Sequence, residues 1–108
     1  MLDTAQGLPA AGLAYALRDC AADTTIASGV TNADGRCDVP LLQGEAMKKG
    51  CYVLRFNVAQ YFRRYNLITE SVPFLDVVEI HFGIADPAAH YHVPLLVSPY
   101  SYTTYRGS

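Results

Sequence analysis

Apolar residues recur at every second position in several short segments of this chain, and this spacing constrains the fold more than any other feature. Leu13, Tyr15 and Leu17 alternate with smaller or charged residues. The same period recurs at Tyr52, Leu54, Phe56 and Val58, and again at Val78, Ile80, Phe82 and Ile84. Because side chains of a strand point alternately to opposite faces, each segment predicts a strand with one buried face. Several such strands separated by turn signals are typical of an antiparallel β-sandwich.

A tight turn and one short helix are predicted between these strands. Residues 25–31 predict a strand, Asp34 and Gly35 form a strong turn signal, and residues 36–42 predict the returning strand. Residues 59–65 break the alternation and suit a short helix. The chain has 108 residues with no linker or repeat, so we expect one all-β domain covering residues 1–108.

Residues 90–98 predict another strand, and its two faces differ in character. The positions that can enter the core are Tyr91, Val93, Leu95 and Val97. The positions on the outer face are His90, His92, Pro94, Leu96 and Ser98. Proline cannot donate to a sheet ladder, so we expect this strand to lie at an edge or to contain an irregularity. An apolar edge strand invites pairing with another chain, which predicts a homo-oligomer. Residues 100–105 predict a final short strand.

Charge and hydropathy exclude several classes of function. The formal net charge is −2, so no broad basic field exists to attract nucleic acid or an anionic membrane. No apolar run approaches the roughly 20 residues that a membrane-spanning helix needs. The amino end has no basic region followed by an apolar stretch, so we expect no secretory signal. These observations predict a cytoplasmic protein without a nucleic-acid or membrane partner.

Cysteines can form a disulfide framework, and histidines can bind a metal ion. Cys20, Cys37 and Cys51 are odd in number and lack Cys-x-x-Cys spacing. This favours reduced structural thiols, with a disulfide between two of them as the alternative. His90 and His92 have the same-face spacing of a metal pair, but the chain holds only three histidines in all. We therefore expect no metal site.

The carboxyl end carries the most specific motif of the chain. Residues 91–99 read Tyr-His-Val-Pro-Leu-Leu-Val-Ser-Pro, and residues 105–108 read Tyr-Arg-Gly-Ser. Together they closely resemble the signature of the 5-hydroxyisourate hydrolases, the purine-catabolic branch of the transthyretin-like family. Residues 2–10, 31–37 and 73–78 are similar to the same family, so the resemblance covers essentially the whole chain.

This resemblance implies a fold, a reaction and a set of site residues. The fold is a transthyretin-like β-sandwich that forms a homotetramer, with substrate sites in a channel between dimers. The reaction is hydrolysis of the cyclic amide of 5-hydroxyisourate to 2-oxo-4-hydroxy-4-carboxy-5-ureidoimidazoline in urate degradation, without a metal or organic cofactor. The family's catalytic positions fall on His92 and Arg36. Its terminal motif places Tyr105 and Ser108 at the substrate, and His90 is a further candidate because it shares the face of His92.

These residue types suit the opening of a cyclic amide. The attacking water must lose a proton, the carbonyl oxygen needs a donor or cation, and the leaving nitrogen must be reprotonated. Imidazole has a reference pKa of about 6.5, which makes His92 the natural base or water-orienting group. Arg36 offers a fixed cation with forked donors for a planar, oxygen-rich substrate. Without the resemblance, an outer-face histidine and an arginine after a turn are more often merely solvated.

One position departs from the family pattern. The family usually has a histidine directly before a Val-Leu-Asp triplet, and here Met1 stands at the valine position. A start placed several residues late, a paralogue with weakened or different activity, and partial replacement by another residue such as His90 all stay open. The alternative function is therefore a transthyretin-like protein that binds a small molecule, or a paralogue with altered activity.

Overall fold

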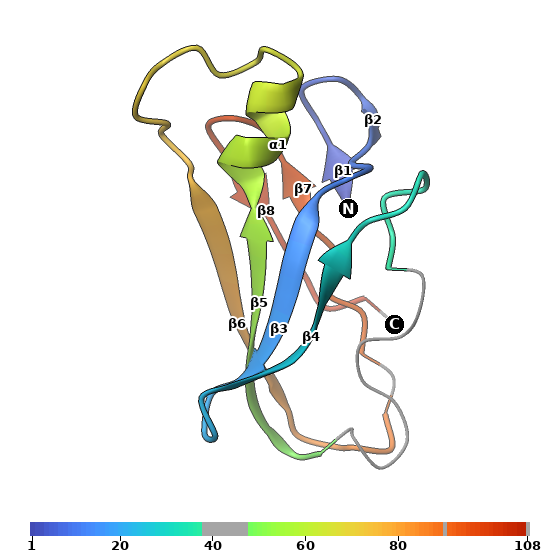
Figure 1. Ribbon diagram of the computed structural model, residues 1–108. Coiled ribbons are helices and arrows are strands. Elements are labelled where there is room, and N and C mark those ends of the chain that lie inside the picture. Colours follow the sequence, from blue (N-terminus) through green and yellow to red (C-terminus); the bar gives the residue numbers. More distant parts are fainter. Residues whose placement is uncertain (38–47, 90, 108) are drawn as a thin grey trace.

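The computed structural model describes residues 1–37, 48–89 and 91–107, and these residues form two four-stranded sheets and one short helix (Figure 1). The strands are β1 (Leu2–Asp3), β2 (Leu8–Pro9), β3 (Ala14–Asp19), β4 (Thr24–Val30), β5 (Gly50–Asn57), β6 (Val77–Ile84), β7 (Leu96–Val97) and β8 (Tyr102–Thr103). The helix is α1 (Val58–Arg64). The predicted sandwich with one short helix is therefore confirmed.

The larger sheet contains the strands with the clearest alternation. Its order is β4-β3-β5-β6, and all neighbours are antiparallel. Strands β5 and β6 pair along their whole length, from Gly50 opposite Ile84 to Asn57 opposite Val77. Glu79 lies on the exposed face of β6, as the pattern predicted. A slip of one residue would turn the apolar face to solvent, so the burial pattern specifies this register.

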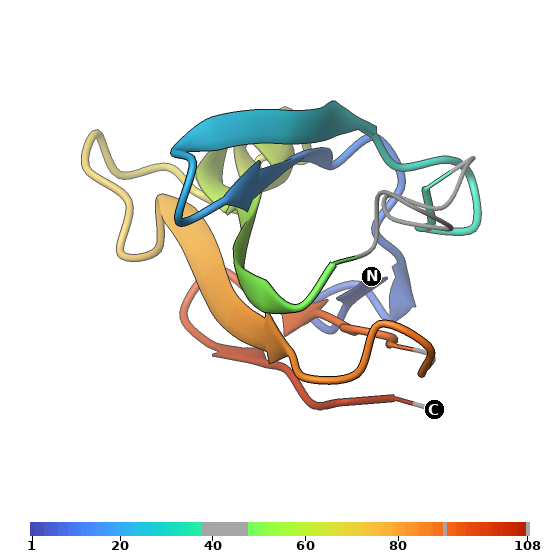
Figure 2. The same ribbon diagram turned by 90° about the horizontal axis from the view of Figure 1, so that it is seen from below.

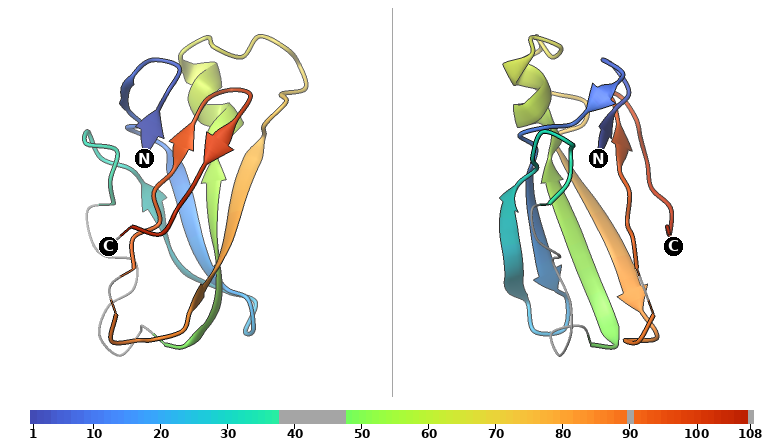
Figure 3. Two further views of the ribbon diagram at one scale, coloured as in Figure 1. Left: turned by 180° about the vertical axis from the view of Figure 1, so that it is seen from behind. Right: turned by 90° about the vertical axis from the view of Figure 1, so that its right-hand side faces the viewer.

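The smaller sheet lies against the larger one as a second layer (Figure 3). Its order is β2-β1-β7-β8, and each of its strands has two residues. Strand β7 is parallel to β1 and antiparallel to β8. In the view from below, the two layers enclose the space that the core side chains fill (Figure 2).

Side chains from both sheets and from α1 share the core of the sandwich. The larger sheet contributes Leu17 and Phe56, the helix contributes Phe62, and β7 with the residue before it contributes Val97 and Leu95. All five are at most 1% exposed. Full burial of side chains of this kind contributes about 1.5–3 kcal/mol each. The apolar contacts between the layers therefore hold the sandwich closed.

A buried carboxylate adds a polar link between β1 and the helix. Asp3 is 0% exposed, and one of its oxygens accepts hydrogen bonds from the backbone N–H groups of Ala5 and Gln6 at 2.9 and 3.0 Å. Its other oxygen accepts from the Gln6 amide at 2.6 Å and from the Tyr61 hydroxyl at 2.9 Å. Burial, together with the hydrogen bond to Asp3, raises the pKa of Tyr61. A buried charge is tolerated when its hydrogen-bonding capacity is satisfied in this way.

The segment around Pro94 differs from the sequence-based expectation. The ladder is limited to β7 and an isolated bridge between His92 and Gly107, instead of a strand over residues 90–98. Strand β7 lies inside its sheet, so the prediction of an edge strand is wrong, whereas the predicted irregularity is present. Pro94 is buried rather than outward-facing, because without a ladder the chain does not keep strict alternation there. The prediction of a homo-oligomer rested on an apolar edge at this strand, so that argument for it no longer holds.

Candidate functional site

The carboxyl-terminal segment lies antiparallel to the segment that carries His92. Leu96 pairs with Thr103, and four residues earlier His92 pairs with Gly107 in the same register. The N–H of Gly107 donates to the carbonyl of His92 at 2.7 Å. Between these two points, the Thr104 hydroxyl donates to the carbonyl of Pro94 at 2.7 Å. The end of the described chain is therefore held beside His92 at three successive places.

His92 is exposed on the face that points away from the core, as the alternation predicted. The tail passes very close to its ring, because a Cβ added to Gly107 would lie 2.6 Å from Nδ1 of His92. Cβ atoms essentially never approach a neighbouring atom so closely, so only glycine lets the tail cross here without displacing the imidazole. The close approach of the tail to His92 thus explains why a glycine stands at position 107 of the terminal motif.

Tyr105 shares the face of His92. Gly107 pairs with His92, and Tyr105 stands two residues before Gly107 on the tail. Because side chains two positions apart along an extended segment lie on one face, Tyr105 projects from the tail on the side of His92, opposite to Arg106. Tyr105 is 58% exposed. The imidazole and the phenol are therefore both exposed, on two paired segments of the smaller layer.

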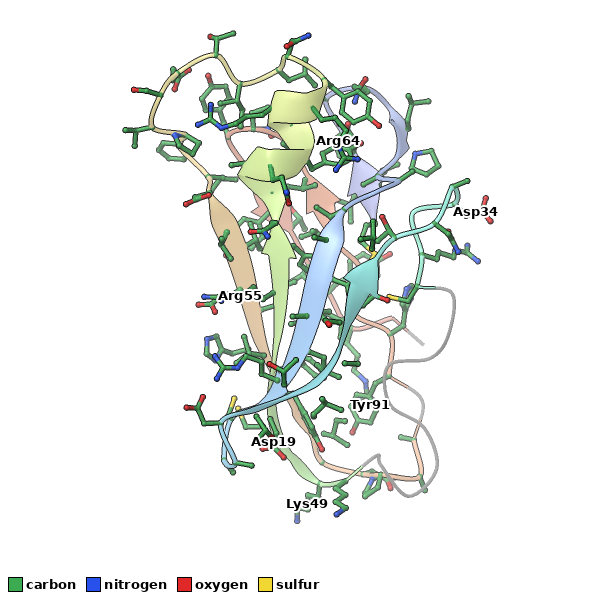
Figure 4. The ribbon with its side chains drawn as sticks, viewed as in Figure 1. Asp19, Asp34, Lys49, Arg55, Arg64 and Tyr91 are labelled. Atoms are coloured by element: carbon green, nitrogen blue, oxygen red, sulfur yellow. The ribbon has the colours of Figure 1, made fainter. Side chains whose placement is uncertain are left out.

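Arg106 lies on the opposite face and packs on Tyr91. Its guanidinium carbon is 4.4 Å from the centre of the Tyr91 ring, a cation–π distance. The Tyr91 hydroxyl accepts hydrogen bonds from the backbone N–H groups of Ala85 and Asp86 at 3.0 and 3.1 Å. Tyr91 therefore joins the corner after β6 to the tail (Figure 4). From the sequence, Tyr91 was predicted only to enter the core. Its position in the chain, between the corner after β6 and His92, was the signal that could have shown that it joins the corner to the tail.

Arg36 follows the predicted tight turn, which is confirmed. Gly35 has a φ of +70° and donates its N–H to the Asn32 carbonyl at 2.9 Å, and the Asn32 side chain accepts from the N–H groups of Asp34 and Arg36. Arg36 is exposed, and within the described residues no hydrogen bond or ion pair engages its guanidinium. Arg36 and Cys37 are not part of a strand, and the rest of the predicted strand over residues 36–42 lies outside the described residues.

The turn of Arg36 is connected to the segment of His92 through the first residues of the chain. The Met1 nitrogen donates to the Gly35 carbonyl at 2.7 Å, and the Leu2 N–H donates to the Leu95 carbonyl at 2.8 Å. Leu95 and His92 are three residues apart, or roughly 10 Å of extended chain. Figure 4 shows Asp34 of the turn and Tyr91 both on the right-hand side of the view. The turn before Arg36 and the segment after His92 are thus both tied to the first two residues of the chain.

Two predicted site residues, His90 and Ser108, lie outside the described residues. Over residues 1–37, 48–89 and 91–107, no group of three or more potential ligand side chains could hold a metal ion. His81 lies on the exposed face of β6, in the larger sheet. In the same residues, α1 has seven residues and no helix has the length and apolarity to cross a membrane.

The arrangement suits proton transfer at an open surface. A neutral imidazole can accept a proton from a bound water, and a phenol beside it can donate a hydrogen bond to a carbonyl or to a ring nitrogen. A guanidinium provides five donors and a permanent positive charge for an oxygen-rich ligand. These are the kinds of group that hydrolysis of a small polar molecule needs.

Comparison with known protein families identifies close relatives over the whole chain. The model of the HIUase/Transthyretin family matches residues 1–107. A protein from Ralstonia nicotianae named 5-hydroxyisourate hydrolase is 51% identical over 110 aligned residues, which cover all of this chain and 94% of the relative. A protein of the same name from Deinococcus radiodurans is 47% identical and is covered to 92% of its length.

Solved structures give the same result for the fold. An (S)-allantoin synthase is 41% identical with a TM-score of 0.93, and the match covers 99% of this chain but only 41% of that longer one. Sea bream transthyretin in complex with thyroxine is 34% identical with a TM-score of 0.81, covering 98% of this chain and 89% of the other. The 5-hydroxyisourate hydrolase of Klebsiella pneumoniae is 34% identical with a TM-score of 0.80, covering 99% and 93%.

Proposed function

Because this chain belongs to the HIUase/Transthyretin family, we propose that it is a hydrolase that opens the cyclic amide of 5-hydroxyisourate. The observation that carries the proposal is the 51% identity, over the whole chain, to a relative named 5-hydroxyisourate hydrolase. The segments that carry His92 and Tyr105 support it, because the backbone pairing of His92 with Gly107 brings the tail that bears Tyr105 to the strand that bears His92.

The alternative is a binding protein without turnover. The similarity to solved structures does not decide between this alternative and the enzyme, but the identity to named relatives does. The transthyretin in complex with thyroxine and the Klebsiella hydrolase have nearly equal TM-scores to this chain, 0.81 and 0.80. Their sequence identities to this chain are both 34%. The curated relatives at about 50% identity bear the name of the enzyme, so the enzyme is the better supported function.

In this proposal, His92 accepts a proton from the attacking water or orients that water at the ring carbonyl. Its exposure on the outer face supports this role, because solvent and substrate both have access to the imidazole. A positioned base of this kind contributes about 10²–10⁴-fold to the rate. The protonated imidazole can then return the proton to the nitrogen that leaves as the ring opens.

Arg36 and Tyr105 bind and polarise the substrate. The exposed guanidinium of Arg36 fits the oxygens of a purine-derived ring and stabilises the charge that develops on the attacked carbonyl. The phenol of Tyr105 donates to the edge of the same ring. Ser108 and His90 complete the proposed substrate site as predicted from the family motif, and no metal or organic cofactor takes part.

The proposed assembly is a homotetramer in which these surfaces face one another. Two observations support an assembly: β6 and β8 are edge strands, and Val77, Tyr102 and Tyr105 on or beside them are exposed. Unpaired strand edges with exposed apolar side chains are surfaces that proteins usually cover. Free thiols at all three cysteines are in keeping with a reducing compartment, which supports the proposed cytoplasmic location.

The test is the ultraviolet decay of freshly prepared 5-hydroxyisourate, with and without the protein. We expect decay faster than the spontaneous rate, in proportion to protein concentration and abolished by prior heat denaturation. Binding of the compound without any acceleration, even at micromolar protein, would instead support the binding protein. Size-exclusion chromatography with light scattering on the same sample tests the homotetramer.

A further inference from the structure

Two of the three cysteines lie opposite each other at one end of the larger sheet. The register of β3 and β5 pairs Asp19 with Tyr52, so Cys20 is the next residue on one strand and Cys51 is its neighbour on the other. The N–H of Cys20 donates to the carbonyl of Cys51 at 3.1 Å, which continues the ladder beyond β3. Since α1 follows the far end of β5, this pair lies at the end of the sandwich away from the helix (Figure 1).

The two sulfur atoms are in contact without being bonded. Sγ of Cys51 lies 3.2 Å from Sγ of Cys20 and donates a hydrogen bond to it. Residues directly opposite in a hydrogen-bonded antiparallel pair have Cα atoms about 5.5 Å apart, which falls within the span of disulfides. The sulfurs need to approach by only about 1 Å to reach the bonded distance of roughly 2.05 Å. A bridge can therefore form here by side-chain rotation alone.

Both thiols are accessible to a small oxidant. Cys20 and Cys51 are exposed, whereas Cys37 is partly buried and packs against the core. The hydrogen bond from Cys51 raises the pKa of Cys20. Next to it, the Asp19 carboxylate accepts the backbone N–H groups of Ala21 and Ala22, which shapes the turn without covering the sulfurs.

We infer that Cys20 and Cys51 form a redox-sensitive dithiol that a peroxide converts to a disulfide, while Cys37 stays reduced. One thiolate attacks a peroxide oxygen, which gives a sulfenic acid and the first water or alcohol. The second thiol attacks the sulfenic sulfur, forms the S–S bond and releases water. Two electrons and two protons leave the protein for each peroxide reduced. A small-molecule thiol such as glutathione reverses the step by thiol–disulfide exchange.

The bridge would close the part of the chain that carries the proposed substrate arginine. The loop between Cys20 and Cys51 includes the turn at Asn32 and Gly35, and Arg36 after it. Cross-linking a loop of about 30 residues restricts the unfolded chain, which for a domain of this size raises the Tm by roughly 10 °C or more. This inference does not depend on the catalytic proposal, because neither thiol is one of the proposed site residues.

The test treats the whole protein with hydrogen peroxide, then alkylates it under denaturing conditions for intact-mass analysis. The reduced protein has three alkylatable cysteines. We expect one after oxidation, a peptide linking Cys20 to Cys51, and a rise in Tm that a reductant reverses. Cys37→Ser is the matched control and should form the same bridge. Cys20→Ser and Cys51→Ser should show neither the bridge nor the rise in Tm.

Three results would overturn the inference. The first is retention of all three alkylatable cysteines in oxidised wild type. The second is a bridge that includes Cys37, or a covalent dimer in place of the internal link. The third is an equal Tm shift in wild type and in Cys20→Ser. Because the two serine variants alter exposed side chains, they are expected to fold, and circular dichroism of each verifies this.

Discussion

The two sheets of this sandwich are held in place by different kinds of interaction. In the larger sheet, β5 and β6 pair over eight residues each and bury one apolar face. In the smaller sheet, two-residue strands leave much of the chain to be positioned by single hydrogen bonds, such as those at His92 and Pro94. Full burial of an apolar side chain contributes about 1.5–3 kcal/mol, and one hydrogen bond a net of about 0.5–1.5 kcal/mol. The larger sheet is therefore the scaffold, and the smaller, loosely tied layer carries His92 and Tyr105.

His92→Ala tests this division where the expected effect is largest. The substitution removes the proposed base, so kcat/KM for 5-hydroxyisourate should fall about 10²–10⁴-fold. The side chain is exposed, so the free energy of unfolding should change by less than about 0.5 kcal/mol. Stopped-flow ultraviolet kinetics and urea denaturation give the two quantities.

His81→Ala is the matched control for that variant, because His81 is an exposed histidine of the scaffold layer. It should leave kcat/KM within about twofold of wild type. The free energy of unfolding should stay within about 0.5 kcal/mol of wild type. If kcat/KM fell as much in His81→Ala as in His92→Ala, the proposal that the base lies on the smaller sheet would be contradicted. A loss of the fold in His92→Ala would contradict its outward placement.

Phe56→Ala probes the scaffold layer from the opposite direction. Phe56 is 0% exposed in the core, so the free energy of unfolding should fall by about 3–5 kcal/mol. The residue is in β5 and far in the chain from the tail, so kcat per folded molecule at low temperature should stay close to wild type. Urea denaturation monitored by tyrosine fluorescence measures the first quantity, and active-site-normalised rates measure the second. Equal loss of stability and rate would show that the layers are not separable.

The same contrast explains which parts of the molecule the sequence could predict. Strands β3, β5 and β6, the helix and the turn at Gly35 follow from alternation and turn chemistry, which are local signals. The smaller sheet was harder, because β1 and β7 pair in parallel across most of the chain and no local pattern encodes that partner. Pro94 was misplaced for the same reason. The family motif predicted His92, Tyr105 and Arg36 as site residues, but the pairing of the tail with the segment of His92 required the register that β7 and β8 begin.

Tyr61→Phe breaks the polar link between β1 and the helix, and we expect an effect of intermediate size. The hydroxyl donates to the buried carboxylate of Asp3 at 2.9 Å, and hydrogen bonds to charged groups contribute about 1.5–3 kcal/mol. The variant should lose that amount near pH 7, as measured by urea denaturation. The other donors to Asp3, from Ala5 and Gln6, remain, so the fold itself should persist.

The pH dependence of the Tyr61→Phe effect has a definite sign. Burial and the Asp3 carboxylate raise the pKa of Tyr61 in the folded protein above the value of about 10 expected in the unfolded chain. The hydroxyl's contribution is therefore fully present below pH 10 and is lost as pH rises toward the folded pKa. The stability difference between wild type and Tyr61→Phe should be constant from pH 7 to pH 9 and shrink above pH 10. A difference that grows above pH 10 would contradict the raised pKa.

Gly107→Ala perturbs the functional layer without touching the core. The new Cβ would lie 2.6 Å from Nδ1 of His92, so either the tail or the imidazole must move. We expect kcat/KM to fall about tenfold, because a small displacement of a base is enough to weaken proton transfer. The free energy of unfolding should change by less than about 1 kcal/mol, since Gly107 contributes only one tail hydrogen bond. An unchanged kcat/KM would show that the close approach of the tail to the His92 ring is not needed for catalysis.

Tyr91→Phe is the mildest of these changes and tests how the tail is supported. The substitution removes the hydroxyl that accepts the N–H groups of Ala85 and Asp86, but it keeps the ring on which Arg106 packs. Both N–H groups are exposed and can bond to water instead, so stability should fall by only about 0.5–1 kcal/mol. The rate should fall by a few-fold at most, because the ring still supports Arg106 next to the tail glycine. Tyr91→Leu, which removes the ring as well, should lower the rate further; equal rates in both variants would mean that the ring contact with Arg106 does not position the tail.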